Sequence, residues 1–261
     1  MGESLMGFTE VALIYDRFND LSAYDHWLAF TQECGGKEVK AVLDVACGTG
    51  YFTRLLVQHF PQVKGIDLNE AMITEAKEHS KNILDNLVFQ QGNMLNLQAE
   101  QGKYDLVTCY ADSLCFLANE EELKQALFSM ANCLKPGGRL LFDVWTPYQL
   151  SQGFDQFSYH DEDENGALLW TSFTDPDELK VTHELTVYNY SHFEGRQALY
   201  TRHEVDLEER TYPLTTYIKY LNEAGFLSQQ IQVRVQFGER LYHEFQDQQA
   251  DRWFFVCQKG E

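Results

Sequence analysis

The chain contains the run Val42-Leu43-Asp44-Val45-Ala46-Cys47-Gly48-Thr49-Gly50. Its apolar, β-branched first half is typical of a buried strand. The glycines that follow allow positive φ angles and let a ligand approach the backbone closely. The helix expected next, over residues 51–60, offers free N–H groups at its start. This order of strand, glycine turn and helix predicts the ligand-binding edge of an α/β sheet.

Asp67 follows Gly48 by 19 residues and ends the next expected strand, 63–66. An acid at that place accepts hydrogen bonds from the hydroxyls of a ribose. The two features together predict an adenosyl ligand, without separating a nicotinamide cofactor from other adenosyl compounds. A tight strand–helix turn that binds nothing is the alternative.

The alternation of strand and helix continues along the chain, which predicts a mostly parallel sheet with helices on both faces. Asn69 can cap a helix that runs to about Leu84, and Asn119 with Glu122 resembles a capping box. The turn at residues 135–138, Lys-Pro-Gly-Gly, is expected to stop that later helix. The other elements expected are strands at 39–45, 87–89, 104–110, 139–145, 231–237 and 253–256, and a helix from Leu214 to about Gly225. The fold class predicted is α/β, a Rossmann-like doubly wound sheet of seven mostly parallel strands.

Two regions depart from this alternation. Residues 1–37 carry apolar residues at helical spacing and are expected to form an N-terminal helical cap. Residues 146–210 lose the helical period, and Asn165-Gly166 and Glu194-Gly195 are hairpin signals. We therefore expect an inserted small antiparallel sheet, a lid or substrate domain, in a Rossmann-like domain made of 38–145 and 211–261.

The composition narrows the classes of partner. The 261 residues are 44% hydrophobic and 23% charged, as in an ordinary globular protein. A net charge of −20 disfavours nucleic acid and anionic lipid as partners. Six scattered Cys without a Cys-x-x-Cys pair, and His residues without metal-ligand spacing, predict no metal site and suit a cytoplasmic protein. The sequence shows no signal peptide and no membrane span, and it leaves monomer and homodimer open.

The motifs together resemble those of the class I S-adenosylmethionine-dependent methyltransferases. Residues 44–50 look like the first motif of that family, residues 65–69 like its ribose segment, and Gln91-Gly92-Asn93-Met94 like its adenine segment, where Asn93 replaces a common Asp. Residues 104–109 and 134–141 look like the fourth-strand motif and the turn before strand five. The helical cap and the insertion match a bacterial subgroup of small-molecule type.

The resemblance implies S-adenosyl-L-methionine as the cofactor and a set of residues that contact it. Asp44 would hold the methionine end, or would merely tie down the turn, and Met72 would contact the adenine, or would only pack in the core. Asp112 would orient the acceptor or take a proton from it, or would cap the following turn. The complete set of implied cofactor contacts is Tyr15, Asp44, Ala46, Gly48, Gly50, Asp67, Leu68, Met72, Asn93, Met94 and Cys109.

Other side chains carry weaker signals. Tyr15, Tyr24 and Trp27 either close over a cationic sulfonium or pack the N-terminal helices. On the expected insertion, His183, Arg202, His203 and Glu204 either contact the acceptor or form a solvated strand face.

The function expected is therefore transfer of a methyl group from S-adenosylmethionine to an unidentified, small-molecule acceptor. Two alternatives stay open at this point. One is a nicotinamide-dependent dehydrogenase, although nothing resembles a catalytic Tyr-Lys pair. The other is a catalytically silent scaffold that binds S-adenosylmethionine.

Overall fold

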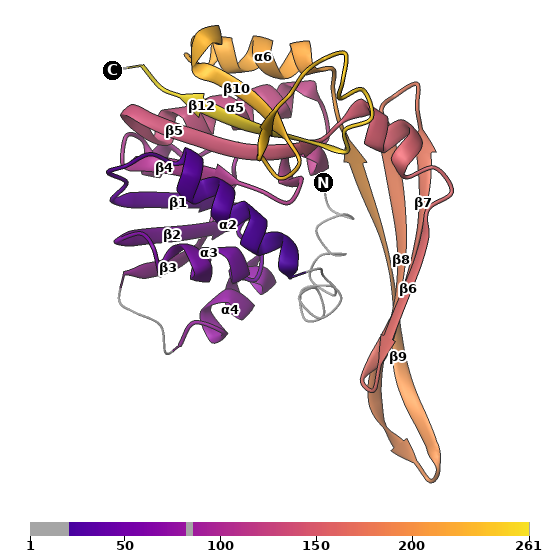
Figure 1. Cartoon of the computed structure of the whole chain (residues 1–261). Coiled ribbons are helices and arrows are strands. Elements are labelled where there is room, and N and C mark those ends of the chain that lie inside the picture. The colour runs from indigo at the N-terminus through magenta and orange to yellow at the C-terminus, as the bar shows by residue number, and fades with distance from the viewer. Residues whose placement is uncertain (1–20, 82–85, 261) are drawn as a thin grey trace.

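The structure, a computed structural model, describes residues 21–81 and 86–260. These residues form a larger sheet flanked by helices and a separate smaller sheet that stands beside it (Figure 1). Among the described residues, no helix combines the length and the apolar character needed to cross a membrane.

The larger sheet has the spatial order β11-β10-β12-β5-β4-β1-β2-β3. The five strands from β5 to β3 are parallel, and β12 joins them antiparallel to β5. In chain order the strands are β1 (Ala41–Val45), β2 (Gln62–Asp67), β3 (Leu87–Gln91), β4 (Tyr104–Cys109), β5 (Leu134–Trp145), β10 (Ile231–Val235), β11 (Arg240–Leu241) and β12 (Arg252–Gln258). The seven strands expected from the sequence are present, and the two-residue β11 adds an eighth at the edge.

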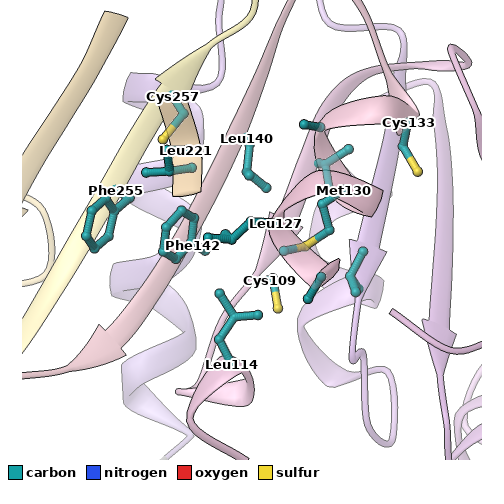
Figure 2. Close-up of a cluster of buried hydrophobic side chains, with 14 of the residues drawn as sticks. Cys109, Leu114, Leu127, Met130, Cys133, Leu140, Phe142, Leu221, Phe255 and Cys257 are labelled. Atoms are coloured by element: carbon teal, nitrogen blue, oxygen red, sulfur yellow. The ribbon is translucent and has the colours of Figure 1, made fainter. Parts of the chain in front are cut away.

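Helices cover both faces of this sheet. They are α2 (Ser22–Cys34), α3 (Tyr51–Leu56), α4 (Glu70–Glu78), α5 (Glu120–Cys133) and α6 (Leu214–Glu223). Helices α2 and α3 pack against side chains such as Val42, Leu106 and Phe254 on one face. The other face carries α5 and α6, whose Leu127 and Leu221 pack with strand residues (Figure 2). Alternate residues of the buried strands thus pack into two separate cores, one on each face of the sheet, as a doubly wound sheet requires.

Several element ends differ from the sequence-based expectation. Helix α3 ends at Leu56 rather than near residue 60, and α4 ends at Glu78 rather than near Leu84. Helix α5 ends at Cys133, before the Lys-Pro-Gly-Gly turn, and β5 already begins at Leu134. The turn is an irregularity inside β5, because the pairing with β4 shifts register there.

The N-caps were predicted more closely. The Asn69 side chain accepts hydrogen bonds from the backbone N–H groups of Ala71 and Met72. Asn119 likewise accepts from the N–H of Glu122, whereas the Glu122 carboxylate accepts from the N–H of Ala118 instead of Asn119. The second half of the expected capping box is therefore displaced by one residue.

The smaller sheet is antiparallel, with the order β6-β7-β8-β9. Its strands are β6 (Ser158–Asp163), β7 (Gly166–Asp175), β8 (Lys180–Glu194) and β9 (Gln197–Arg210). The hairpins lie at the two predicted turns, where Asp163 pairs with Gly166 and Glu194 with Gln197. The insertion follows β5 and lies beside the carboxyl edge of the larger sheet (Figure 1). Its β8–β9 hairpin extends well beyond the other strands.

The insertion packs on the larger domain through one face. Leu168, Val187, Val205 and Leu207 form a buried cluster that contacts Phe116 in the short helix η2 (Ser113–Phe116) after β4. A short helical turn after β5, η3 (Gln149–Gly153), contributes Leu150 to a second cluster with Val181. The insertion is therefore anchored next to the loop that follows β4.

Candidate functional site

The turn between β1 and α3 has a backbone that few side chains tolerate. Ala46, Gly48 and Gly50 all have positive φ angles, of 57°, 53° and 76°. A Cβ at Gly50 would lie 2.5 Å from the ring of Phe89, so only glycine fits there. A Cβ at Gly48 would meet no atom of the described residues within 4 Å. The turn is thus closed on its inner side and open above Gly48.

Asp67 holds this turn in place from the end of β2. Its Oδ2 accepts a hydrogen bond of 2.9 Å from the Gly48 N–H, and its Oδ1 accepts one of 2.8 Å from the Asn69 N–H. Burial raises the pKa of Asp67 despite these bonds. The side chain stays half-buried, and an ionised carboxylate has about four acceptor positions, so acceptor capacity remains beside the open space above Gly48.

Asp44 is buried near the end of β1, just before the glycine turn. Its two carboxylate oxygens accept hydrogen bonds from the hydroxyls of Thr53 (2.6 Å) and Thr108 (2.8 Å). Burial raises the pKa of Asp44 to about 6, although both hydrogen bonds oppose the rise. Asp44 therefore joins β1 to α3 and β4, and its expected role toward the methionine end stays a prediction.

The remaining expected contacts lie along the same edge with different exposures. Leu68 has 41% of its surface exposed, whereas Met72 is buried. Asn93 is half-buried, and its side chain accepts a hydrogen bond from the Leu95 N–H. The Met94 side chain packs on the core, and that of Cys109 is fully buried within it (Figure 2). Only the backbone of Cys109 is therefore available to a ligand.

Asp112 is part of a buried charged network at the carboxyl edge of β4 and β5. Its Oδ1 lies 2.6 Å from Nη2 of Arg252, the first residue of β12. The same guanidinium pairs through Nη1 with Asp143 on β5, and the Trp27 Nε1–H donates to Asp143 at 3.1 Å. The Arg252 guanidinium also stacks on the ring of Trp145, 3.6 Å from its centroid. Asp112 is thus paired with a cation and adopts a left-handed φ of 51°.

The aromatic residues of the N-terminal cap pack against each other and the sheet. Tyr24 and Trp27 are buried and lie edge to face, with ring centroids 5.2 Å apart. Tyr15, which the sequence also singled out, lies outside the described residues.

The four residues noted on the insertion separate into two groups. Arg202 and Glu204 form an exposed ion pair, and His203 is half-buried. His183 is 2% exposed and lies among aromatic rings. Val181 and Val187, at alternate positions of the same strand, are buried as well, so His183 lies on the inward face of the insertion.

Three charged residues of this region were missed by sequence reasoning, although signals for two of them existed. Asp143, like Asp44, is an acid inside an otherwise apolar strand, where a carboxylate needs a partner. Glu209 follows Val205 and Leu207 at alternate positions of one strand, and all three side chains are buried. Arg252 precedes a run of buried residues, and no sequence pattern singles it out.

Comparisons with known proteins identify the family to which the chain belongs. A methyltransferase-domain family profile matches residues 42–138. The chain is 31% identical over 254 residues to the protein named "putative methyltransferase YqeM" of Bacillus subtilis (strain 168), covering 96% of each chain.

Solved structures share the fold over nearly the whole chain. An S-adenosylmethionine-dependent methyltransferase from Clostridium acetobutylicum ATCC 824 is 24% identical, with a TM-score of 0.76 and coverage of 97% of this chain and 98% of that one. The sugar N-methyltransferase KedS8 from Streptoalloteichus sp. ATCC 53650 is 25% identical, with a TM-score of 0.70 and coverage of 95% and 92%.

Proposed function

The chain belongs to the class I S-adenosylmethionine-dependent methyltransferases, and from this premise we propose that it methylates a small-molecule acceptor at the carboxyl edge of the larger sheet. Its cofactor is S-adenosyl-L-methionine. The observation that carries the proposed site is the half-buried Asp67 carboxylate beside the open space above Gly48.

The residues at this edge fit the cofactor. In our proposal Asp67 accepts hydrogen bonds from the ribose hydroxyls, and the exposed Leu68 packs on the adenine. Asn93 and Met94 lie on the adenine side, and Met72 supports them from the core. The backbone at Ala46, Gly48 and Gly50 leaves room for the methionine end, which the buried Asp44 carboxylate attracts from below.

S-adenosylmethionine supplies a methyl carbon that is already activated when it binds. The chain's own residues then need to orient the acceptor and exclude water. We assign Asp112 a positioning role in this task, because its carboxylate is paired with Arg252. In our proposal the insertion, residues 146–210, and helix α2 act as the walls of the acceptor site.

Two observations support a small molecule as the acceptor. The relative KedS8, which is similar along nearly the whole chain, is a sugar N-methyltransferase. The net charge of −20 opposes the approach of a nucleic acid backbone.

Methyl transfer from tritiated S-adenosylmethionine into a bacterial extract tests the acceptor class. We expect label in the protein-free small-molecule fraction and none above background in the protein and nucleic acid fractions. Label confined to the macromolecular fractions would refute the proposed acceptor class.

Titration calorimetry with S-adenosylhomocysteine tests the cofactor site. Asp67→Ala removes hydrogen bonds from a charged acceptor, and we expect a loss of about 1–3 kcal/mol of binding free energy, roughly 5- to 150-fold in Kd. Glu70→Ala, an exposed acid three residues away, is the matched control and should bind as the parent chain does. Equal affinities for all three proteins would remove Asp67 from the site.

A further inference from the structure

His183 on β8 is a buried histidine with one nitrogen bound and one unbound. The Trp170 Nε1–H donates to its Nδ1 at 3.1 Å, and the Ser172 hydroxyl lies 2.8 Å from the same atom. Because Nδ1 accepts, the proton of the neutral ring is on Nε2. Within residues 21–81 and 86–260, this Nε2 has no hydrogen-bond partner.

Glu209 on β9 faces that free nitrogen. Its Oε1 lies 3.8 Å from His183 Nε2, which is too long for a hydrogen bond. Its Oε2 has no hydrogen bond of good geometry within the described part of the chain, although the Trp145 indole N–H and the Asp112 carboxyl lie near enough to shift the pKa of Glu209. Both side chains are at most 5% exposed. A buried polar atom without a partner destabilises a fold, so two of them on neighbouring side chains call for a reason.

Burial disfavours the charged form of both groups. Burial, together with the nearby Asp112 carboxylate, raises the pKa of Glu209 well above its usual value, while Arg252 opposes the rise. Burial lowers the pKa of His183 to about 4. Burial therefore disfavours an ion pair between the two side chains, and His183 presents an N–H donor to Glu209.

The location connects the pair to the methyl-transfer edge. Asp112, which interacts with Glu209, follows the carboxyl end of β4, and β9 packs on η2 directly after it. The rings of Phe154 and Trp170 flank His183, with centroids 4.8 and 5.2 Å from the imidazole. An acceptor held between the insertion and the β4 edge would thus meet apolar rings and two free polar atoms.

We propose that His183 and Glu209 form the acceptor-recognition pair of this enzyme and bind an uncharged polar group of the acceptor, a hydroxyl or a neutral amine. This inference rests on the proposed function. Such a group accepts from Nε2–H and donates to the Glu209 carboxyl, so it satisfies both atoms at once. The pair is closed to solvent, so the acceptor reaches it when the insertion separates from η2, and the unsatisfied atoms lower the cost of that separation.

The group that the pair binds lies beside the methylated atom rather than at it. A lone pair that accepts a hydrogen bond from His183 is not available to attack the methyl carbon.

Stability and activity should move in opposite directions when the pair is removed. Glu209→Met and His183→Phe replace orphaned polar groups by apolar ones of similar size. We expect each substitution to raise Tm by roughly 2–4 °C. The Kd for S-adenosylhomocysteine should stay within about twofold of the parent value. Methyl transfer into the small-molecule extract should fall at least tenfold when the extract is dilute. Concentrated extract should restore part of the rate, because a recognition role raises KM. Glu208→Met changes an exposed neighbour on the other face of β9 and should alter neither binding nor transfer.

A lower Tm, or failure to fold, for both Glu209→Met and His183→Phe would assign the pair to the fold and overturn the proposal, as would unchanged transfer. A parent chain that neither binds S-adenosylhomocysteine nor labels the extract would instead refute the proposed function.

Discussion

Carboxylates buried at strand ends carry the chemistry of this edge at the scale of single residues. Asp44 and Asp143 are both nearly or fully buried, and burial raises the pKa of each to about 6. The two differ in their partners, because Asp44 accepts from two hydroxyls and Asp143 pairs with a guanidinium. Each joins segments that are far apart in sequence.

The raised pKa of Asp44 makes the stability of the fold depend on pH in a defined direction. Its usual pKa is 3.8 and its folded pKa is about 6, so the folded state holds the proton more tightly. Protonated Asp44 therefore adds to the free energy of unfolding. This added stability is fully present below pH about 4 and is lost as the pH rises to about 6. At about 1.4 kcal/mol per pKa unit, the loss is about 3 kcal/mol.

Urea unfolding of the parent chain and of Asp44→Asn at several pH values measures this pH-dependent contribution to the free energy of unfolding. The amide keeps a similar shape but does not titrate, and Asp143 and the other acids cancel in the difference. We expect the parent chain to lose about 3 kcal/mol relative to Asp44→Asn between pH about 4 and about 6. A difference that stays constant over this range would contradict the assignment.

Residues inside a local motif were predictable, and residues joined across the fold were not. Asp67, Gly48 and Gly50 stand at a spacing along the chain that is enough to identify their place at the sheet edge. Arg252 meets Asp112 and Asp143 only because β12 lies against β5. No local pattern encodes that pairing.

At the scale of elements, the β1–α3 turn shows how one short segment does two jobs. Gly50 lets α3 and α4 pack closely around Phe89, whereas Gly48 keeps space free above the turn. Both have positive φ, but only one has a crowded Cβ position.

The two glycines should therefore respond differently to alanine. Gly50→Ala combines a left-handed backbone with a clash against Phe89, and we expect about 2–5 kcal/mol of lost stability. Gly48→Ala has the backbone cost alone, about 1–2 kcal/mol, but its methyl group enters the proposed cofactor space. Thermal unfolding and calorimetry with S-adenosylhomocysteine separate the effects. Similar stability losses for the two variants, with cofactor affinity unaffected by Gly48→Ala, would contradict this division.

The elements themselves were largely predicted, and their ends were less so. Periodicity placed all seven long strands of the larger sheet and the hairpins of the insertion. The start of β5 at Leu134 was missed, because a Lys-Pro-Gly-Gly turn inside a strand looks like the end of a helix until β4 supplies the pairing. Tertiary pairing, not local preference, sets that boundary.

At the scale of the whole molecule, one buried cation connects segments from both ends of the chain. Arg252 on β12 binds Asp143 on β5 and Asp112 after β4, and Trp27 of α2 donates to the same Asp143. The N-terminal helix, the sheet and the loop beside the insertion therefore share one charged centre. A shift of α2, β5, β12 or the loop after β4 would break a hydrogen bond or an ion pair of this centre.

Arg252→Met should destabilise the whole molecule rather than one segment. The thioether can still pack on Trp145, so the variant reports mainly on the charges left behind. Removing one partner of a buried pair costs about 3–5 kcal/mol, because the remaining carboxylates are buried and uncompensated. Arg240→Met is the matched control: Arg240 also pairs with an aspartate, Asp247, but it is 42% exposed, so a far smaller change is expected. Thermal unfolding that shows equal losses for the two variants would mean that the Arg252 centre holds the segments no more firmly than a surface pair does.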